Sequence, residues 1–266
     1  MSAFEFYLDL FAFSPKTRPV TKLEERIKKF IEDEKTSESL DSAVFSKIIG
    51  SETKADFLMG NRSFVTELKT INGDPKGRLE KRIKERFAQP GAPFGYGQFS
   101  LDAALKALPD RAEQLKIIND LSGRAVRKNL QKSNEQISST KAILGIDGAS
   151  GLTILMNDSE PIIDVSNIGY STRAAIESNE AIFSHIAYIW VSVECHRIKM
   201  TDGALGFPQL LIRRSKNRLS ELKFLYSMLG AWANFNGATM HQLQHYGSWE
   251  TMQPFFDGDR PTMSLY

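Results

Sequence analysis

The sequence predicts an α/β protein in which helices flank a central mixed β-sheet and a helical extension follows at the C-terminal end. Three patterns lead to this expectation. Apolar residues follow Thr21 at helical spacing, residues 55–71 alternate like a β-hairpin, and the apolar runs 151–156 and 182–193 lie among helical segments. This order of elements is typical of a sheet covered by helices.

The composition bounds the class of protein. The 266 residues include 34 Lys and Arg against 32 Asp and Glu, and 41% are hydrophobic, which is typical of a globular chain. Cys195 is the only cysteine, which excludes an intramolecular disulfide framework and a Cys-based zinc site. We expect a core over residues 1–198 and an extension over residues 199–266, which could belong to the same domain.

No export or membrane segment is expected. The first 13 residues are apolar but acidic, and they lack the basic start and the small-residue cleavage site of a signal peptide. The longest uncharged apolar run, residues 181–193, is too short for a membrane-spanning helix. We therefore expect a cytoplasmic protein without a membrane partner.

The first part of the chain is expected to contain a helix and a hairpin. Thr21 and Glu24 have the spacing of a capping box, and the apolar residues that follow mark one face of an amphipathic helix. Residues 40–49 could form a short helix or a strand. Residues 55–59 and 62–71 then read as two β-arms joined by the turn pair Gly60-Asn61.

The remaining elements are mostly helical. Residues 76–87 form a basic helix with apolar residues four apart, and a loop rich in glycine and proline follows. Helical patterns then occupy residues 101–108 and 110–144. The two apolar runs are expected to be buried strands, the second of which could begin as helix, and residues 213–235 form a late helix.

The hairpin places three chemically useful side chains near one another. Glu67 and Lys69 are two apart on the second arm, so they share a face of the strand. A two-residue turn would make Glu67 the diagonal neighbour of Asp56, whereas a four-residue loop would place the two carboxylates directly opposite. Both registers bring two carboxylates and one amine to a common point.

These charges are costly on a face that helices should cover, unless they pair or bind a cation. Two carboxylates at close range repel unless a metal neutralises them, and oxygen ligands of this kind suit Mg²⁺. A lysine beside such a metal can orient a water. Two carboxylates that bind a metal and a lysine that orients a water are the groups that metal-assisted hydrolysis of a phosphodiester uses.

Asp56, ten intervening residues and then Glu67-Leu68-Lys69 resemble the active-site motif of the PD-(D/E)xK nuclease superfamily, the restriction endonuclease-like proteins. In that superfamily the aspartate follows a first helix, and the two motif strands form a hairpin within a mixed sheet flanked by helices. The resemblance implies that Asp56, Glu67 and the Leu68 carbonyl hold a divalent metal, with Lys69 near the attacking water. Ala55 replaces the proline of the motif.

The resemblance also implies two further contributions. Many members use an acidic residue on the first helix; Glu24, Glu25 and Glu34 are candidates, and Glu34 extends the apolar face of that helix. Some members carry a later helix with Gln and Lys that approaches the active site before a core strand, which points to Gln136 and Lys141.

The flanks of the motif suit a polyanionic substrate. Six basic residues occur between 76 and 86, and Lys76, Arg78 and Arg82 are the ones that we expect to contact phosphate. Lys128 belongs to a second basic stretch. A solvated helix face is the alternative explanation for both stretches.

Other patterns are weaker. The chain has five acid-x-Lys triplets, including a second Glu-Leu-Lys at residues 221–223, but only Glu67-Leu68-Lys69 lies on an alternating strand with an aspartate on the partner arm. Cys195 and His196 would face opposite sides of a strand, which disfavours a catalytic pair. His241 and His245 lack a clear third metal ligand.

These patterns favour a nuclease that hydrolyses phosphodiester bonds, with DNA as the expected partner and Mg²⁺ as the cofactor, for which Mn²⁺ could substitute. A catalytically silent protein on the same fold, binding nucleic acid or forming a complex, is the second hypothesis. A non-enzymatic interaction module is the third. Cleavage of both strands would need a partner, and a homodimer is compatible with the sequence.

Overall fold

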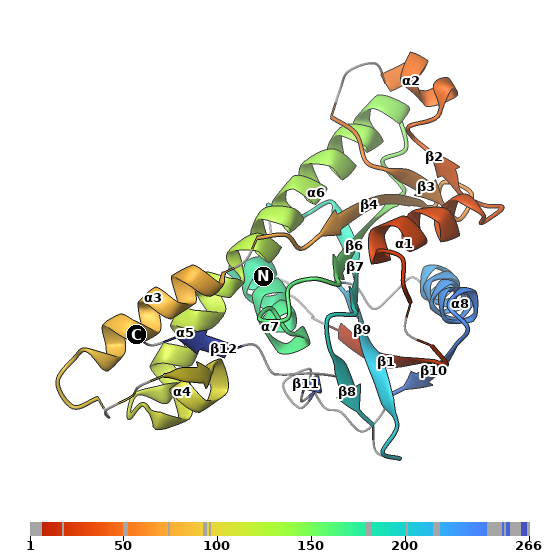
Figure 1. Ribbon diagram of the computed structural model, residues 1–266. Helices are drawn as coiled ribbons and strands as arrows, with labels where there is room; N and C mark the ends of the chain where they lie inside the picture. Colours follow the sequence, from red (N-terminus) through yellow and green to blue (C-terminus); the bar gives the residue numbers. More distant parts are fainter. Residues whose placement is uncertain are drawn as a thin grey trace.

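The computed structural model describes residues 7–17, 19–49, 53–73, 75–92, 95, 97–178, 182–200, 202–214, 219–243, 252, 254–255 and 262–264. Its centre is a mixed, largely antiparallel sheet (Figure 1). The main path of the sheet runs through β10 (Ala238–Gln242), β1 (Tyr7–Pro15), β9 (Leu205–Arg213), β7 (Ile186–Val193), β6 (Ser150–Asn157), β4 (Phe64–Thr70), β3 (Phe57–Met59) and β2 (Glu38–Ser39). Only the pairs β4–β6 and β6–β7 on this path are parallel.

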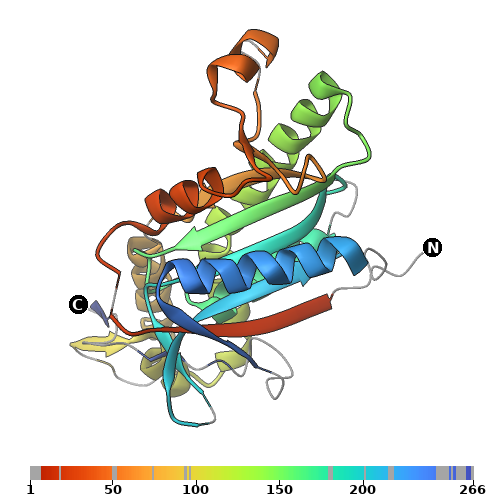
Figure 2. The same cartoon turned by 90° about the vertical axis from the view of Figure 1, so that its right-hand side faces the viewer.

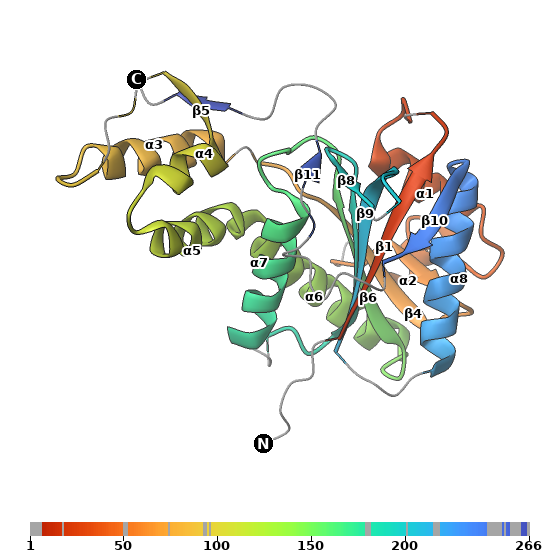
Figure 3. The same ribbon diagram turned by 90° about the horizontal axis from the view of Figure 1, so that it is seen from below.

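Helices cover both faces of this sheet, as the view in Figure 3 shows. Helices α6 (Arg124–Leu144) and α7 (Val165–Ser178) lie on one face, and α1 (Leu23–Glu32) and α8 (Leu219–Phe235) lie on the other, which Figure 2 presents to the viewer. Alternate residues of each strand therefore enter two separate apolar cores. Among the described residues, no helix combines the length and apolarity that a membrane crossing requires.

A smaller helical group is inserted between β4 and α6 and lies to one side of the sheet (Figure 1). It contains α3 (Lys76–Phe87), α4 (Leu101–Ala107) and α5 (Arg111–Ser122), and its own core includes Leu79, Ile83 and Ile118. The remaining short elements are α2 (Ala43–Ile49), β5 (Gln98–Ser100), β8 (Arg197–Lys199), β11 (Pro254–Phe255) and β12 (Thr262–Ser264). Because β12 pairs with β5, the C-terminal segment reaches the inserted group.

The structure confirms an α/β fold with a mixed sheet flanked by helices and the basic helix at residues 76–87. Several boundaries differ from the expectation. The expected helix at residues 110–144 is divided at Gly123 into α5 and α6, and the late helix begins at Leu219. The capping box is wrong: the Leu23 N–H donates to Asp158 Oδ2 (3.1 Å), so a residue after β6 caps α1.

The segment after residue 199 was expected to be helical, but it also supplies strands to the main sheet. Strand β9 lies between β1 and β7, and β10 pairs with the outer side of β1. Strand β1 was not expected at all. It carries Asp9 inside an apolar run, and the Arg213 Nε atom of β9 lies 2.9 Å from its carboxylate. The two ends of the sequence therefore build one side of the sheet together.

Replacing Gly151 by alanine is expected to destabilise the sheet at β6, the strand beside β4. A Cβ atom at Gly151 would lie 2.0 Å from the backbone carbonyl oxygen of His185, which cannot move without shifting the start of β7. We expect the free energy of unfolding to fall by about 3 kcal/mol, as measured by urea denaturation. Gly77→Ala in α3 is the matched control, because a Cβ there meets nothing within 4 Å. Equal losses in the two variants would contradict this prediction.

Candidate functional site

The hairpin adopts the register with a four-residue loop. Phe57 pairs with Thr66 and Met59 with Phe64, so Asp56 lies opposite Glu67. Residues 60–63 form the loop, in which Gly60, Asn61 and Arg62 have positive φ angles of 60°, 53° and 65°. Of the two registers that the sequence allowed, this one places the carboxylates directly across from each other.

The chain before β3 leaves the sheet and is held against α6. The side-chain amide of Gln136 donates to the Lys54 carbonyl oxygen (2.8 Å), and the Ala55 N–H donates to Thr140 Oγ1 (2.8 Å). Strand β3 begins only at Phe57, so the end of β4 extends beyond its partner. The candidate site lies at this step in the sheet, beside α6.

The side chain of Asp56 bonds to the part of β4 that extends beyond β3. Its Oδ2 atom accepts a hydrogen bond from the Leu68 N–H (2.8 Å). Because the N–H and the C=O of one strand residue point to the same neighbouring strand, the Leu68 carbonyl also faces this side. The Asp56 carboxylate and the Leu68 carbonyl thus lie along the same open edge of β4.

Glu67 and Lys69 form a tightly held ion pair on the face that α6 covers. The Lys69 ammonium bonds to Glu67 Oε1 and donates to Gln136 Oε1 (2.7 Å). Glu67 is 1% exposed, and its second oxygen, Oε2, has no hydrogen-bond partner among the described residues. One amide of α6 therefore positions the lysine, while one buried carboxylate oxygen stays available to a ligand.

Both carboxyl groups hold their protons more strongly than usual. Burial is the main cause of the raised pKa of Asp56, which the hydrogen bond from Leu68 partly offsets. Burial, followed by the charge of Asp56, raises the pKa of Glu67 to about 8, and Lys69 offsets only part of this effect. Burial, and for Glu67 also the charge of the facing Asp56 carboxylate, therefore favours the protonated forms, which a bound cation would oppose.

These residues fit a divalent metal with few protein ligands. Within the described ranges, no three His, Cys, Asp or Glu side chains form a metal site by themselves. The site nevertheless offers oxygen donors of the kind that Mg²⁺ accepts while it keeps several waters. They are two facing carboxylates, of which one has a buried oxygen without a hydrogen-bond partner among the described residues, and one backbone carbonyl. The residues that would hold it are Asp56, Glu67 and Leu68.

The first helix brings a different acid to the motif strand than the one chosen from the sequence. Glu34 lies beyond the end of α1 and accepts a hydrogen bond from Thr36 (3.3 Å). Glu24, in the first turn of α1, accepts one from the hydroxyl of Thr70 (2.7 Å), which lowers the pKa of Glu24. Thr70 follows Lys69 directly, so Glu24 reaches the end of β4. The sequence favoured Glu34 because that residue extends the apolar face of the helix. The contact of Glu24 with Thr70 is a tertiary contact, which helical periodicity does not reveal.

Of the other residues that the sequence predicted for the site, Gln136 contacts the Glu67–Lys69 pair through a hydrogen bond and is part of the site. Lys141 is only 8% exposed, and partial burial, followed by the charge of Lys141, lowers the pKa of the half-buried His185. Lys128 is exposed on α6. Three basic residues lie on α3 in the inserted group: Lys76 and Arg78 are exposed and Arg82 is half-buried.

The rival sites have structural partners. The His196 Nε2 atom accepts from the Val165 N–H (3.1 Å), and Cys195 contacts the Glu160 carbonyl oxygen (3.7 Å). Burial raises the pKa of the Cys195 thiol, so it remains neutral. His241 lies on β10, and His245 is outside the described residues.

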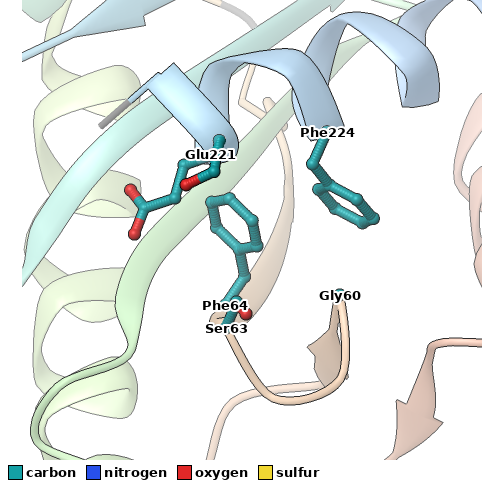
Figure 4. A pocket seen from close by; sticks show the side chains of 6 residues that line it. Gly60, Ser63, Phe64, Glu221 and Phe224 are labelled. Atoms are coloured by element: carbon teal, nitrogen blue, oxygen red, sulfur yellow. The ribbon is translucent and has the colours of Figure 1, made fainter. Parts of the chain in front are cut away.

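A cavity of about 110 Å³ lies on the other side of the sheet, between the hairpin loop and the start of α8 (Figure 4). Phe64 and Phe224 stack in it, with ring centroids 5.2 Å apart. Its carboxylate, Glu221, accepts hydrogen bonds from Ser150 Oγ (2.9 and 3.0 Å) and from the Tyr188 hydroxyl (2.8 Å). These bonds join α8 to β6 and β7, which gives the second Glu-Leu-Lys triplet a structural role.

Comparison of the chain with protein-family models, with curated proteins and with solved structures found no match.

Proposed function

We propose that the protein is a Mg²⁺-dependent nuclease that hydrolyses phosphodiester bonds, with DNA as its substrate. The observation that carries the proposal is the convergence of Asp56, Glu67 and Lys69 on adjacent β-arms, with Glu67 buried and one of its oxygens without a hydrogen-bond partner. A weak surface ion pair does not explain this geometry, because Glu67 is almost fully buried.

The order of the elements supports the resemblance to the PD-(D/E)xK superfamily. Helix α1 precedes the hairpin β3–β4, and α6 brings Gln136 to the motif lysine before strand β6. Strand β6 is parallel to β4 and helices cover both faces of the sheet. This is the arrangement that the motif in the sequence leads one to expect.

Each residue has a role in hydrolysis that follows from its position. When bound by Asp56, Glu67 and the Leu68 carbonyl, Mg²⁺ would polarise the phosphate and stabilise the charge that develops on it. Lys69, held by Glu67 and Gln136, donates a hydrogen bond that orients the attacking water. The water oxygen bonds to phosphorus as one ester P–O bond breaks, which leaves a phosphate monoester and a hydroxyl.

Incubation of the protein with plasmid and with single-stranded DNA tests this proposal. We expect cleavage with Mg²⁺ and none with EDTA. DNA binding that persists in EDTA, without cleavage under either condition, would instead favour a catalytically silent binder. An interaction module that recognises proteins predicts neither cleavage nor a salt-dependent affinity for DNA.

A further inference from the structure

The two helices that flank the candidate site differ in charge. Helix α1 carries three basic and three acidic residues, so its net charge is zero. Helix α6 carries five basic residues against one acid, and α3 carries six against two. In Figure 1 the first turns of α6 point toward the inserted group that contains α3. The net charge of the helices therefore attracts a polyanion at the site more strongly along α6 than along α1.

Two lysines of α6 stand next to the residues that contact the motif strand. Gln136 bonds to Lys69, and the side-chain amide of Asn129 donates to the Thr70 carbonyl oxygen (3.1 Å). At 3.6 residues per turn, Lys132 and Lys128 lie about 40° and 80° around the helix from Gln136, on the side away from the core. Both are exposed, and within the described part of the chain neither forms an ion pair.

The spacing of these lysines suits a sugar-phosphate backbone. They lie about 6 and 12 Å from Gln136 along the helix axis, in the direction of α3. Twelve ångströms corresponds to roughly three or four phosphates of one strand of a duplex. We propose that Lys128 and Lys132 bind the phosphates on one side of the cleaved bond, so that the substrate strand runs along α6 toward α3. This inference rests on the proposed action on nucleic acid.

The test compares three variants that remove lysine or arginine from different faces. Lys128→Ala/Lys132→Ala removes the proposed contacts. Arg127→Ala is the first control, because Arg127 is exposed on the same helix about 180° from Gln136. Lys29→Ala is the second control, because Lys29 is exposed on α1, the other flank. Alanine is the best helix former, so all three variants should fold, which thermal melting checks.

Binding is measured in EDTA with a fluorescein-labelled single-stranded oligodeoxynucleotide and with the corresponding duplex, over a range of salt concentrations. We expect the double variant to raise the Kd at least about tenfold and to reduce the slope of log K against log salt by about two for the duplex. Each control should change the Kd by less than about twofold.

Unchanged binding by the double variant, equal losses in either control, or no binding by the wild-type protein would overturn this inference. Because EDTA prevents metal-dependent cleavage, this result is separate from the nuclease assay. A wild-type protein that binds DNA through the two lysines but never cleaves it would retain the path of the strand along α6 and refute the enzyme.

Discussion

Replacing Lys69 by alanine is expected to reduce Mg²⁺-dependent cleavage by at least about 10³-fold, the range typical for loss of a group that acts on the attacking water. The ammonium of Lys69 is fixed by Glu67 and by Gln136, so the substitution removes a hydrogen-bond donor that the fold holds in place. Single-turnover cleavage of a labelled substrate measures the loss.

The chain offers a matched control for this experiment. Lys223 is exposed on α8 and belongs to an identical Glu-Leu-Lys triplet whose glutamate has a structural role. Lys223→Ala should therefore cleave as fast as the wild type. Cleavage by Lys69→Ala at the wild-type rate would refute the proposed role of Lys69.

A second variant guards against a loss of folding. Lys69→Ala removes the partner of a buried carboxylate, which can itself be destabilising. Asp56→Asn keeps the shape of the side chain and leaves the Glu67–Lys69 pair in place, but it removes one of the two charges that would hold the metal. We expect it to lose cleavage to a similar extent and to retain DNA binding in EDTA.

Local patterns predicted the elements around the site but not the register of the hairpin. The pair Gly60-Asn61 is typical of a two-residue turn, whereas the loop has four residues and includes Arg62 at a positive φ. Arg62 is held there by both oxygens of Glu38 on β2, at 2.7 and 2.8 Å. Glu38 lies 24 residues before Arg62, so no pattern within the hairpin contains this contact.

Contacts between residues far apart in the sequence also explain why strand β1, the cap of α1 and the role of Glu24 were not predicted. Asp9 interrupts the apolar run of β1 and makes it unlike a buried strand, yet its partner, Arg213, is more than 200 residues away. The cap of α1 comes from Asp158, and the bond between Glu24 and Thr70 alone identifies the acid of the first helix that reaches the motif strand. The spacing of Asp56, Glu67 and Lys69 along the chain identified the candidate residues. Contacts between segments far apart in the sequence determine how the elements around them are arranged.

Stability of the metal-free protein is expected to fall as the pH rises from about 5 to about 9. The pKa of Glu67 is about 8 in the folded protein and near 4.5 in the unfolded chain, so the folded state binds this proton more strongly. The resulting stabilisation is complete below the unfolded pKa and is lost as the pH rises through the folded one. The raised pKa of Asp56 acts in the same direction.

Thermal melting in EDTA between pH 5 and pH 9 measures this change, which we expect to be on the order of a few kcal/mol. Glu67→Gln is the control, because its amide has the same shape and does not titrate in this range. Its melting temperature should vary much less with pH. A wild-type profile as flat as that of the variant would show that Glu67 is already ionised in the folded state.

Metal binding should reverse the trend, because a carboxylate must lose its proton before it can coordinate Mg²⁺. The apparent Mg²⁺ affinity is therefore expected to rise up to about tenfold per pH unit below pH 8 and to level off above it. Mg²⁺ should raise the melting temperature more at pH 8.5 than at pH 6. The same increment at both pH values would mean that Mg²⁺ binds without displacing the Glu67 proton, and hence that Glu67 is not a metal ligand.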